Sequence, residues 1–251
     1  MPILSPDRYL DLLRGDADRL AELAGRDLSA IVPTCPGWVV RDALVHTGHV
    51  YLHKLANMRT QARAEFPPTP EPEADEVGWF RSALDELVGE FVARGPDAPS
   101  YTWHEADQTV GFWFRRMAHE TAVHRVDVES AFDEVTPIAG DLAVDGIDEL
   151  LDIFLAGPWD PDDPDWGDVS PQAGAGTTTA VRAGDRGWWI TLQPDRIDIG
   201  HAEQPAGLSV SGAASDVLLW LWGRLGDAAV TIDGDPAALA ALRDRLRIAG
   251  Q

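Results

Sequence analysis

The sequence has 251 residues, of which 45% are hydrophobic and 25% charged, a composition typical of a folded protein with a sizeable core. Its 42 acidic and 20 basic side chains give a formal net charge of −22, and so acidic a surface repels nucleic-acid phosphates and anionic lipid headgroups, which argues against nucleic-acid and membrane partners. No apolar run reaches the roughly 18 residues that cross a bilayer, the N-terminal segment lacks the pattern of a signal peptide, and the single cysteine fits a reducing compartment, so we expect a cytoplasmic protein.

Apolar residues at helical spacing predict four helices in the first half of the chain. The predicted helices run from Pro6 to Ala24, from Val39 to about Met58, from about Ala74 to Ala93 and from about Val110 to Phe132. Glycines end the first and third helices, and turn-forming or proline-rich segments separate the others. This pattern favours an antiparallel four-helix bundle over residues 1–135, a scaffold that places ligands on facing helices.

Residues 136–251 have a different pattern, which predicts a smaller α+β domain and makes the whole chain an α+β protein. A helix over Leu142–Leu155 precedes the aspartate-rich segment 160–168, which lacks the spacing of an EF-hand and which we interpret as a solvated loop. Short strand-like runs and two helices follow, with the strands at Thr177–Arg182, Gly187–Gln193, Ile197–His201, Leu208–Ser211 and Ala229–Ile232 and the helices at Ala213–Arg224 and Ala237–Leu246. We expect the domain boundary near residues 134–140.

The strongest functional signal lies in the fourth predicted helix, FWFRRMAHETAVHRVDVESAF. At about 100° per residue, Glu120 and His124 fall at the centre of one apolar face. The opposite face, which we assign to solvent, carries Arg115, Ala118, Ala122, Arg125 and Glu129. An unpartnered buried carboxylate is costly, and the i, i+4 spacing lets a carboxylate and an imidazole converge on one point. A divalent cation between them would satisfy both, and a simple buried Glu–His pair is the alternative.

A third ligand is expected from the second predicted helix, whose segment VRDALVHTGHVYLHK carries His46, His49 and His53 on one side. Two histidines and a carboxylate with open coordination positions form the ligand set of catalytic zinc sites and of some iron sites. A structural zinc site would more often use cysteines, whereas the one cysteine here, Cys35, lies in a predicted turn and is interpreted as a packing residue. Among the tryptophans, Trp38 and Trp113 are candidates for lining a pocket, and we expect four others in the core of the second domain: Trp188, Trp189, Trp220 and Trp222.

The segments TCPGWVVRDALVH and AHETAVHRVDVE resemble the mycothiol-dependent maleylpyruvate isomerase family, within the wider DinB-like group of metal-binding four-helix bundles. In that family a histidine eight residues after the tryptophan of a Gly-Trp turn binds metal. Trp38 is followed at that distance by His46, so the resemblance singles out His46 from the three histidines. The family's fourth-helix E-x-x-x-H ligands match Glu120 and His124, which completes the implied metal ligands His46, Glu120 and His124.

The second half resembles the family's C-terminal domain, which is similar to sterol-carrier folds. Its segment SGAASDVLLWLWGRLGD places Arg224 where the resemblance implies an arginine that binds or polarises the substrate. Arg224, together with Arg116, would offset the charge of substrate carboxylates in an otherwise acidic protein.

The activity implied by the resemblance is addition of a metal-bound thiolate to an electrophilic small molecule, with mycothiol as the thiol cosubstrate, zinc as the expected metal and cis–trans isomerisation as the reaction type. The substrate would be a small electrophile that can carry carboxylates, and the protein a monomer or a homodimer. Three alternatives stay open at this stage: a mycothiol S-transferase acting on another electrophile, a metal hydrolase that activates water, and a non-enzymatic ligand-binding module.

Overall fold

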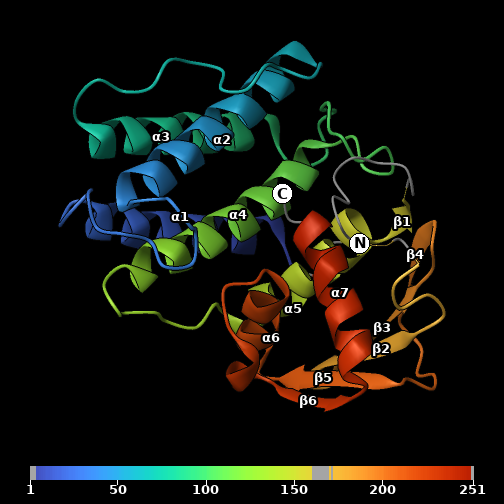
Figure 1. The fold of residues 1–251 in the computed structure, drawn as a ribbon. Coiled ribbons are helices and arrows are strands. Elements are labelled where there is room, and N and C mark those ends of the chain that lie inside the picture. Colours follow the sequence, from blue (N-terminus) through green and yellow to red (C-terminus); the bar gives the residue numbers. More distant parts are fainter. Residues whose placement is uncertain (1–3, 160–169, 171, 250–251) are drawn as a thin grey trace. The chain divides into compact units, whose positions relative to one another are not determined.

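The computed structural model describes residues 4–159, 170 and 172–249 (Figure 1). The chain divides into two compact units, Met1–Thr136 and Pro137–Gln251. The first unit is helical and the second combines a sheet with helices, which confirms the α+β class. The aspartate-rich segment 160–168 lies outside the described residues, so its interpretation as a solvated loop stays a prediction. Within the described residues, every helix is too short or too polar to span a bilayer.

Four helices form the N-terminal unit, and each begins and ends within about two residues of its predicted bounds: α1 (Pro6–Ala24), α2 (Val40–Thr60), α3 (Glu76–Arg94) and α4 (Val110–Ser130). The hydroxyl of Ser5 accepts a hydrogen bond from the backbone N–H of Arg8 and so caps α1. Gly95 ends α3 at a φ of +75°, a conformation that glycine adopts without strain. Helix α1 packs chiefly on α4, and α2 packs on both α3 and α4.

Helix α4 is enclosed on nearly all sides, so the solvent face predicted for it is wrong. Arg115, Arg125 and Glu129 are only 8%, 3% and 0% exposed. Helix α1 covers this face and brings Asp16 within 3.1 Å of the Arg125 guanidinium, which also binds Glu129. Glu129 accepts further hydrogen bonds from Arg19 and from the backbone and hydroxyl of Thr136. The charges are therefore buried as a closed network, which helical periodicity alone does not distinguish from a solvated face.

Within its described residues, the C-terminal unit contains a six-stranded sheet and three α-helices. The helices are α5 (Gly140–Glu149), α6 (Ala214–Leu221) and α7 (Pro236–Ala249), and a π-helical turn, η1 (Leu150–Leu155), continues α5. The strands are β1 (Gly157–Pro158), β2 (Thr178–Ala183), β3 (Arg186–Leu192), β4 (Arg196–Gly200), β5 (Leu208–Gly212) and β6 (Thr231–Gly234). Their order in the sheet is β1-β4-β3-β2-β5-β6, and only the β2–β5 pair is parallel.

Tryptophans fill the core of the C-terminal unit, as the sequence predicts. Trp188 is fully buried and its indole N–H donates to Asp148 of α5 at 2.6 Å, which ties β3 to that helix. Trp189 and Trp220 are each 4% exposed. Trp222 differs from this prediction: it follows α6 directly, is only half-buried and lines a surface pocket.

Candidate metal centre

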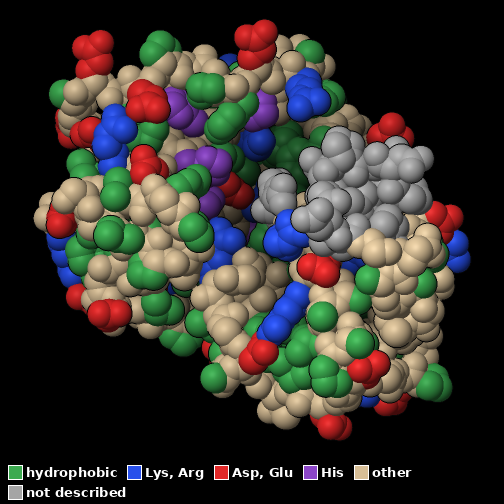
Figure 2. Space-filling view, in the orientation of Figure 1, with side chains coloured by type: hydrophobic (Ala, Val, Ile, Leu, Met, Phe, Trp, Pro, Cys, Tyr) green, Lys and Arg blue, Asp and Glu red, His purple; other side chains and the backbone are tan. Residues whose placement is uncertain are grey.

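The N-terminal unit brings His46 of α2 together with Glu120 and His124 of α4. Glu120 Oε1 lies 3.4 Å from His46 Nε2 and 3.3 Å from His124 Nε2. One donor atom from each of the three residues lies within 4.8 Å of the other two. The side chains of His46, Glu120 and His124 are 32%, 16% and 9% exposed, so the cluster opens toward solvent on the His46 side. Histidine side chains gather at the surface of this unit in Figure 2.

The spacing of these donor atoms fits a small divalent ion better than direct hydrogen bonding. The two N···O distances exceed the roughly 2.7–3.2 Å of an ordinary N–H···O hydrogen bond. Donor atoms about 2.0–2.1 Å from a tetrahedrally coordinated ion are separated from one another by roughly 3.3–3.4 Å. Two imidazole nitrogens and one carboxylate oxygen are also the donor types of catalytic zinc sites. Three such donors would leave a fourth position open.

A buried carboxylate stands behind His124. Asp127, which is 0% exposed, accepts a hydrogen bond from His124 Nδ1 at 3.0 Å, and its other oxygen accepts one from the Thr34 hydroxyl at 2.7 Å. Because Nδ1 is the donor to Asp127, Nε2 is the nitrogen that faces Glu120 and can present a lone pair. A carboxylate bonded to the remote nitrogen is the usual support of a metal-binding histidine.

Glu120 forms an ion pair with Arg116, whose guanidinium donates to Oε2 at 2.5 Å. Burial by itself raises the pKa of Glu120, but the charge of Arg116 and the contacts with His124 and His46 outweigh it and hold this pKa well below its ordinary value. The carboxylate is therefore ionised, with Oε2 occupied by Arg116 and Oε1 directed at the two imidazoles.

The pKa of His124 is shifted in the opposite direction, upward. Burial lowers its pKa, whereas the neighbouring carboxylates of Asp127 and Glu120 raise it more strongly, to about 9. In the absence of a metal ion, His124 is therefore an imidazolium near neutral pH, and a cation entering the cluster must displace its proton.

An aromatic side chain covers the two imidazoles. The Trp38 indole stacks on His124 at 6.0 Å between ring centroids and tilts over His46 at 5.2 Å. Beside His46 lies a pocket of about 300 Å³, whose walls include Trp38, Phe66 and Arg41. The prediction that Trp38 lines a pocket is confirmed. Trp113 does not line this pocket: it is fully buried, and its indole N–H donates to Ser100 at 2.9 Å.

Comparisons with known proteins give the chain its family. The profile of the mycothiol maleylpyruvate isomerase N-terminal domain matches residues 10–129, and that of the family's C-terminal domain matches residues 141–241. The chain belongs to the mycothiol maleylpyruvate isomerase family.

A crystal structure of the mycothiol-dependent maleylpyruvate isomerase matches 92% of this chain and 95% of its own, at 14% identity and a TM-score of 0.58. A histidine-to-alanine mutant of that isomerase matches over the same shares at the same identity, with a TM-score of 0.59. At this identity the likeness shows a common fold. No curated protein matches the chain.

The histidines of α2 that the family pattern leaves aside occupy different surroundings. His49 is 4% exposed and packs edge-on against Trp79 at 5.0 Å. His53 Nε2 bonds the carbonyl of Ala64 at 3.0 Å, and its Nδ1 lies 3.0 Å from Lys54 Nζ. Neither joins the cluster of His46, Glu120 and His124.

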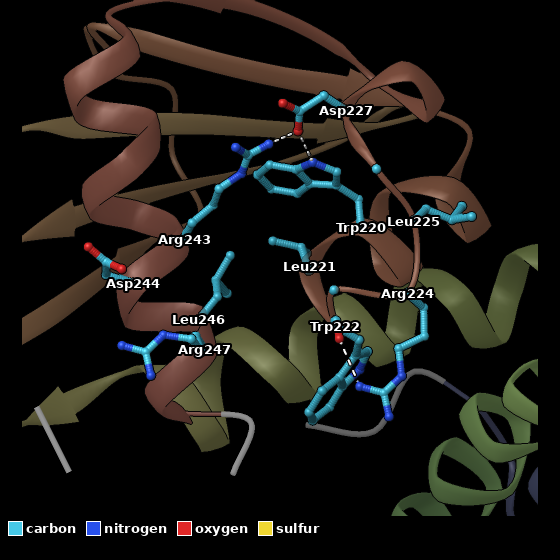
Figure 3. Close-up of a pocket in the computed structure, with 12 residues that line it drawn as sticks. Trp220, Leu221, Trp222, Arg224, Leu225, Asp227, Arg243, Asp244, Leu246 and Arg247 are labelled. Atoms are coloured by element: carbon cyan, nitrogen blue, oxygen red, sulfur yellow. Dashed lines mark hydrogen bonds and ion pairs between the residues drawn. The ribbon is translucent and has the colours of Figure 1, made fainter. Parts of the chain in front are cut away.

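Arg224, the arginine implied by the family resemblance, lies in the C-terminal unit just after α6 (Figure 3). It is half-buried, and its guanidinium donates to the backbone carbonyl of Trp222 at 2.9 Å. It lines a pocket of about 510 Å³ between α7 and the end of α6. On the opposite wall Arg243 is paired with Asp227, which also accepts a hydrogen bond from Trp220.

Two features of the site were not identified from the sequence. Asp127 was not recognised as a supporting carboxylate, although its i+3 spacing from His124 was a usable signal. Lys54 was not singled out, because its aromatic neighbours come from a loop, Trp103, and from helix α4, Trp113.

Proposed function

We propose that this protein is a mycothiol-dependent enzyme in which His46, Glu120 and His124 bind one zinc ion, and that it catalyses cis–trans isomerisation of a small unsaturated acid. The observation that carries this proposal is the convergence of the three donor atoms, at separations that suit a tetrahedral ion, in a chain of the maleylpyruvate isomerase family. The hydrogen bond from His124 Nδ1 to the buried carboxylate of Asp127 supports the proposal further, because metal-binding histidines usually carry such a bond on the remote nitrogen.

The residues of the cluster have separable tasks. Arg116 fixes the rotamer of Glu120 by binding Oε2, so that Oε1 is presented to the metal position. Asp127 fixes the ring of His124 and increases the basicity of its Nε2. Trp38 covers both imidazoles and excludes water from one side of the cluster. The partial exposure of His46 leaves a route by which a thiol can reach the remaining coordination position.

A free thiol has a pKa of about 8.5 and is mostly protonated at neutral pH. A divalent metal held by these ligands would stabilise the thiolate of mycothiol, which is the reactive form. In the proposed reaction the sulfur adds to one carbon of a cis double bond conjugated to a carbonyl, and the π electrons move to the carbonyl oxygen as an enolate. Rotation about the resulting single bond and expulsion of the thiolate restore the double bond in the trans form. Basic side chains, Arg224 among them, would offset the negative charge of the substrate.

The test is turnover of maleylpyruvate by the purified chain, with zinc and mycothiol each supplied or withheld. We expect isomerisation only when both are present, and loss of both bound zinc and turnover in His46→Ala, Glu120→Ala and His124→Ala. A useful control is His49→Ala, which removes a neighbouring histidine of α2 that does not join the cluster and should retain stoichiometric zinc. Full zinc occupancy in any of the three ligand variants would remove that residue from the site.

The same assay separates this reaction from its competitors. Accumulation of a stable mycothiol adduct instead of a trans product would identify an S-transferase. Turnover of an ester or amide without thiol would identify a hydrolase. Zinc binding that raises thermal stability while no electrophile is consumed would indicate a purely structural metal.

A further inference from the structure

Lys54 is the only lysine in the sequence, and the other 19 basic side chains are arginines. It lies on α2, eight residues after His46, which places it about 12 Å further along the helix at the usual 1.5 Å rise per residue. A chain whose remaining basic side chains are all arginines has a lysine here, about two turns along α2 from His46 of the candidate metal centre.

Aromatic rings and a histidine position the Lys54 ammonium group. Its Nζ lies 5.4 Å from the ring centroid of Trp103 and 5.4 Å from that of Trp113. Its Nζ is also 3.0 Å from Nδ1 of His53. Because the Ala64 carbonyl can only accept, His53 Nε2 carries the ring proton and Nδ1 is the acceptor for Lys54. One of the three ammonium donors is therefore committed, and the group lies against two indoles that also pack on each other.

Within the part of the chain that the structure describes, Lys54 forms no ion pair with a carboxylate, although acidic residues outnumber basic ones two to one. Burial lowers the pKa of Lys54 to about 8, with a smaller opposing effect of Glu120 and further lowering by Arg116 and Arg63. A half-buried cation whose charged form is disfavoured gains from any anion that can approach it. Trp103, one wall of this position, is 43% exposed, so the ammonium group lies close to solvent.

Lys54 and Arg116 lie to the same side of the candidate metal centre. Helices α2 and α4 pack together so that His46 faces Glu120 and His124, while Lys54 faces Trp113, which lies seven residues before Glu120. Arg116 lies between Trp113 and Glu120 in the sequence of α4 and contacts Glu120 directly. The order along the helix pair is therefore imidazoles, then Glu120 with Arg116, then Lys54.

We propose that Lys54, assisted by Arg116, binds a carboxylate of the substrate beside the metal centre and thereby selects acidic electrophiles. This inference rests on the proposed function, since it assigns a substrate class to the same site. A carboxylate accepting hydrogen bonds from the ammonium group would use the donors that His53 leaves over. The compact ammonium group suits a position against two indole rings, where a planar guanidinium would present its donors in a different plane.

The single lysine permits a direct test of binding. Protein grown with lysine labelled with ¹³C at Cε gives one side-chain NMR signal, which belongs to Lys54. The zinc-loaded protein is titrated with maleate, a small cis-dicarboxylate, and separately with its neutral dimethyl ester. We expect a saturable shift of the Lys54 signal with maleate and none with the ester. No shift with maleate, or equal shifts with both compounds, would overturn the proposal.

Calorimetry then compares the maleate affinity of the unaltered protein with that of single-residue variants. Lys54→Met should bind maleate ten- to a hundredfold more weakly than the unaltered protein, and Lys54→Arg should recover part of that loss. Arg59→Gln is the matched control, because it removes one positive charge from the same helix at an exposed ion pair with Glu90, and its affinity should stay within twofold. Zinc content and thermal midpoint confirm that each variant is folded. Equal weakening in Lys54→Met and Arg59→Gln would reduce the effect to net charge and overturn the assignment.

Turnover distinguishes failure of this inference from failure of the proposed function. Isomerisation of maleylpyruvate with an unchanged KM in Lys54→Met leaves the proposed function intact and refutes the carboxylate subsite. Maleate binding that depends on Lys54, without any mycothiol-dependent turnover, supports the subsite and refutes the proposed reaction.

Discussion

The pH dependence of zinc binding should report the proton that His124 carries in the metal-free protein. The neighbouring carboxylates raise the pKa of His124 to about 9, whereas the pKa of Glu120 lies well below its ordinary value. Zinc needs the neutral imidazole, so protons compete with it wherever the pH is below the pKa of His124. Because that pKa is raised, the competition extends above neutral pH.

The size of the pH effect on zinc affinity follows from the two pH units between neutral pH and the pKa of His124. Each unit is worth about 1.36 kcal/mol, so the proton on His124 costs roughly 2.7 kcal/mol of zinc affinity at pH 7. The apparent zinc affinity should rise about tenfold per pH unit over this range and level off near pH 9. Glu120 contributes no proton there, because it is already ionised.

Competition against a chromophoric chelator of known pH dependence measures the affinity across pH 7–10. Calorimetry at pH 7.5 in buffers of different ionisation enthalpy counts the protons released, and nearly one should come from His124. An apparent affinity that stays constant between pH 7 and 9, with no proton released at pH 7.5, would refute the assignment of His124 as a protonated group that the metal displaces.

Three other perturbations test separate parts of the structure. Asp127→Asn removes the charge behind His124 and should lower zinc affinity about 10- to 100-fold at pH 10, above the pKa of His124, where the imidazole is mostly neutral in either protein; chelator competition at that pH measures it, and unaltered affinity would deny Asp127 a supporting role. Arg125→Ala leaves Glu129 buried without its closest cation and should cost about 3–5 kcal/mol of unfolding free energy in urea, with zinc stoichiometry retained; a loss below 1 kcal/mol would mean that the network contributes little. Arg224→Ala should keep its zinc but lower kcat/KM for maleylpyruvate, and unchanged kinetics would remove Arg224 from catalysis.

Helical periodicity predicted the N-terminal unit well because each helix carries a regular apolar face. The leucines that predicted α1, Leu10, Leu13, Leu20 and Leu23, are all buried. Strands β2 to β6 of the C-terminal unit were also located to within a few residues, whereas the two-residue strand β1 was not predicted. Their order in the sheet was not predicted, because the parallel pairing of β2 with β5 depends on contacts between distant segments that no local pattern encodes.

The residues of the candidate site likewise fall into those that local spacing predicts and those that depend on distant contacts. Residues on a single helix, Glu120 and His124, could be paired from their spacing, whereas choosing His46 from three histidines of α2 required the family resemblance. Lys54 was not predicted as a site residue, because its aromatic neighbours belong to distant segments: Trp103 to a loop and Trp113 to α4. Periodicity describes one element at a time and gives no information on which loop closes over it.

Helix α4 shows why spacing alone cannot separate a structural ion pair from a functional one. It contains two Arg–Glu pairs at i, i+4, Arg116 with Glu120 and Arg125 with Glu129, each bonded at 2.5 Å. Both oxygens of Glu129 are occupied by arginine, hydroxyl or backbone donors, with Arg19 and Thr136 completing the network.

Glu120 differs from Glu129 at one atom. Its Oε2 is bound by Arg116, but its Oε1 faces two imidazole nitrogens at 3.3 and 3.4 Å, too far for good hydrogen bonds and suitably spaced for ligands of one ion. A carboxylate that was needed only for stability would be expected to close its network as Glu129 does, since an imperfectly bonded buried oxygen costs free energy. The open side of Glu120 is therefore the feature on which we base the proposal of a metal site here, in place of a second structural network on the same helix.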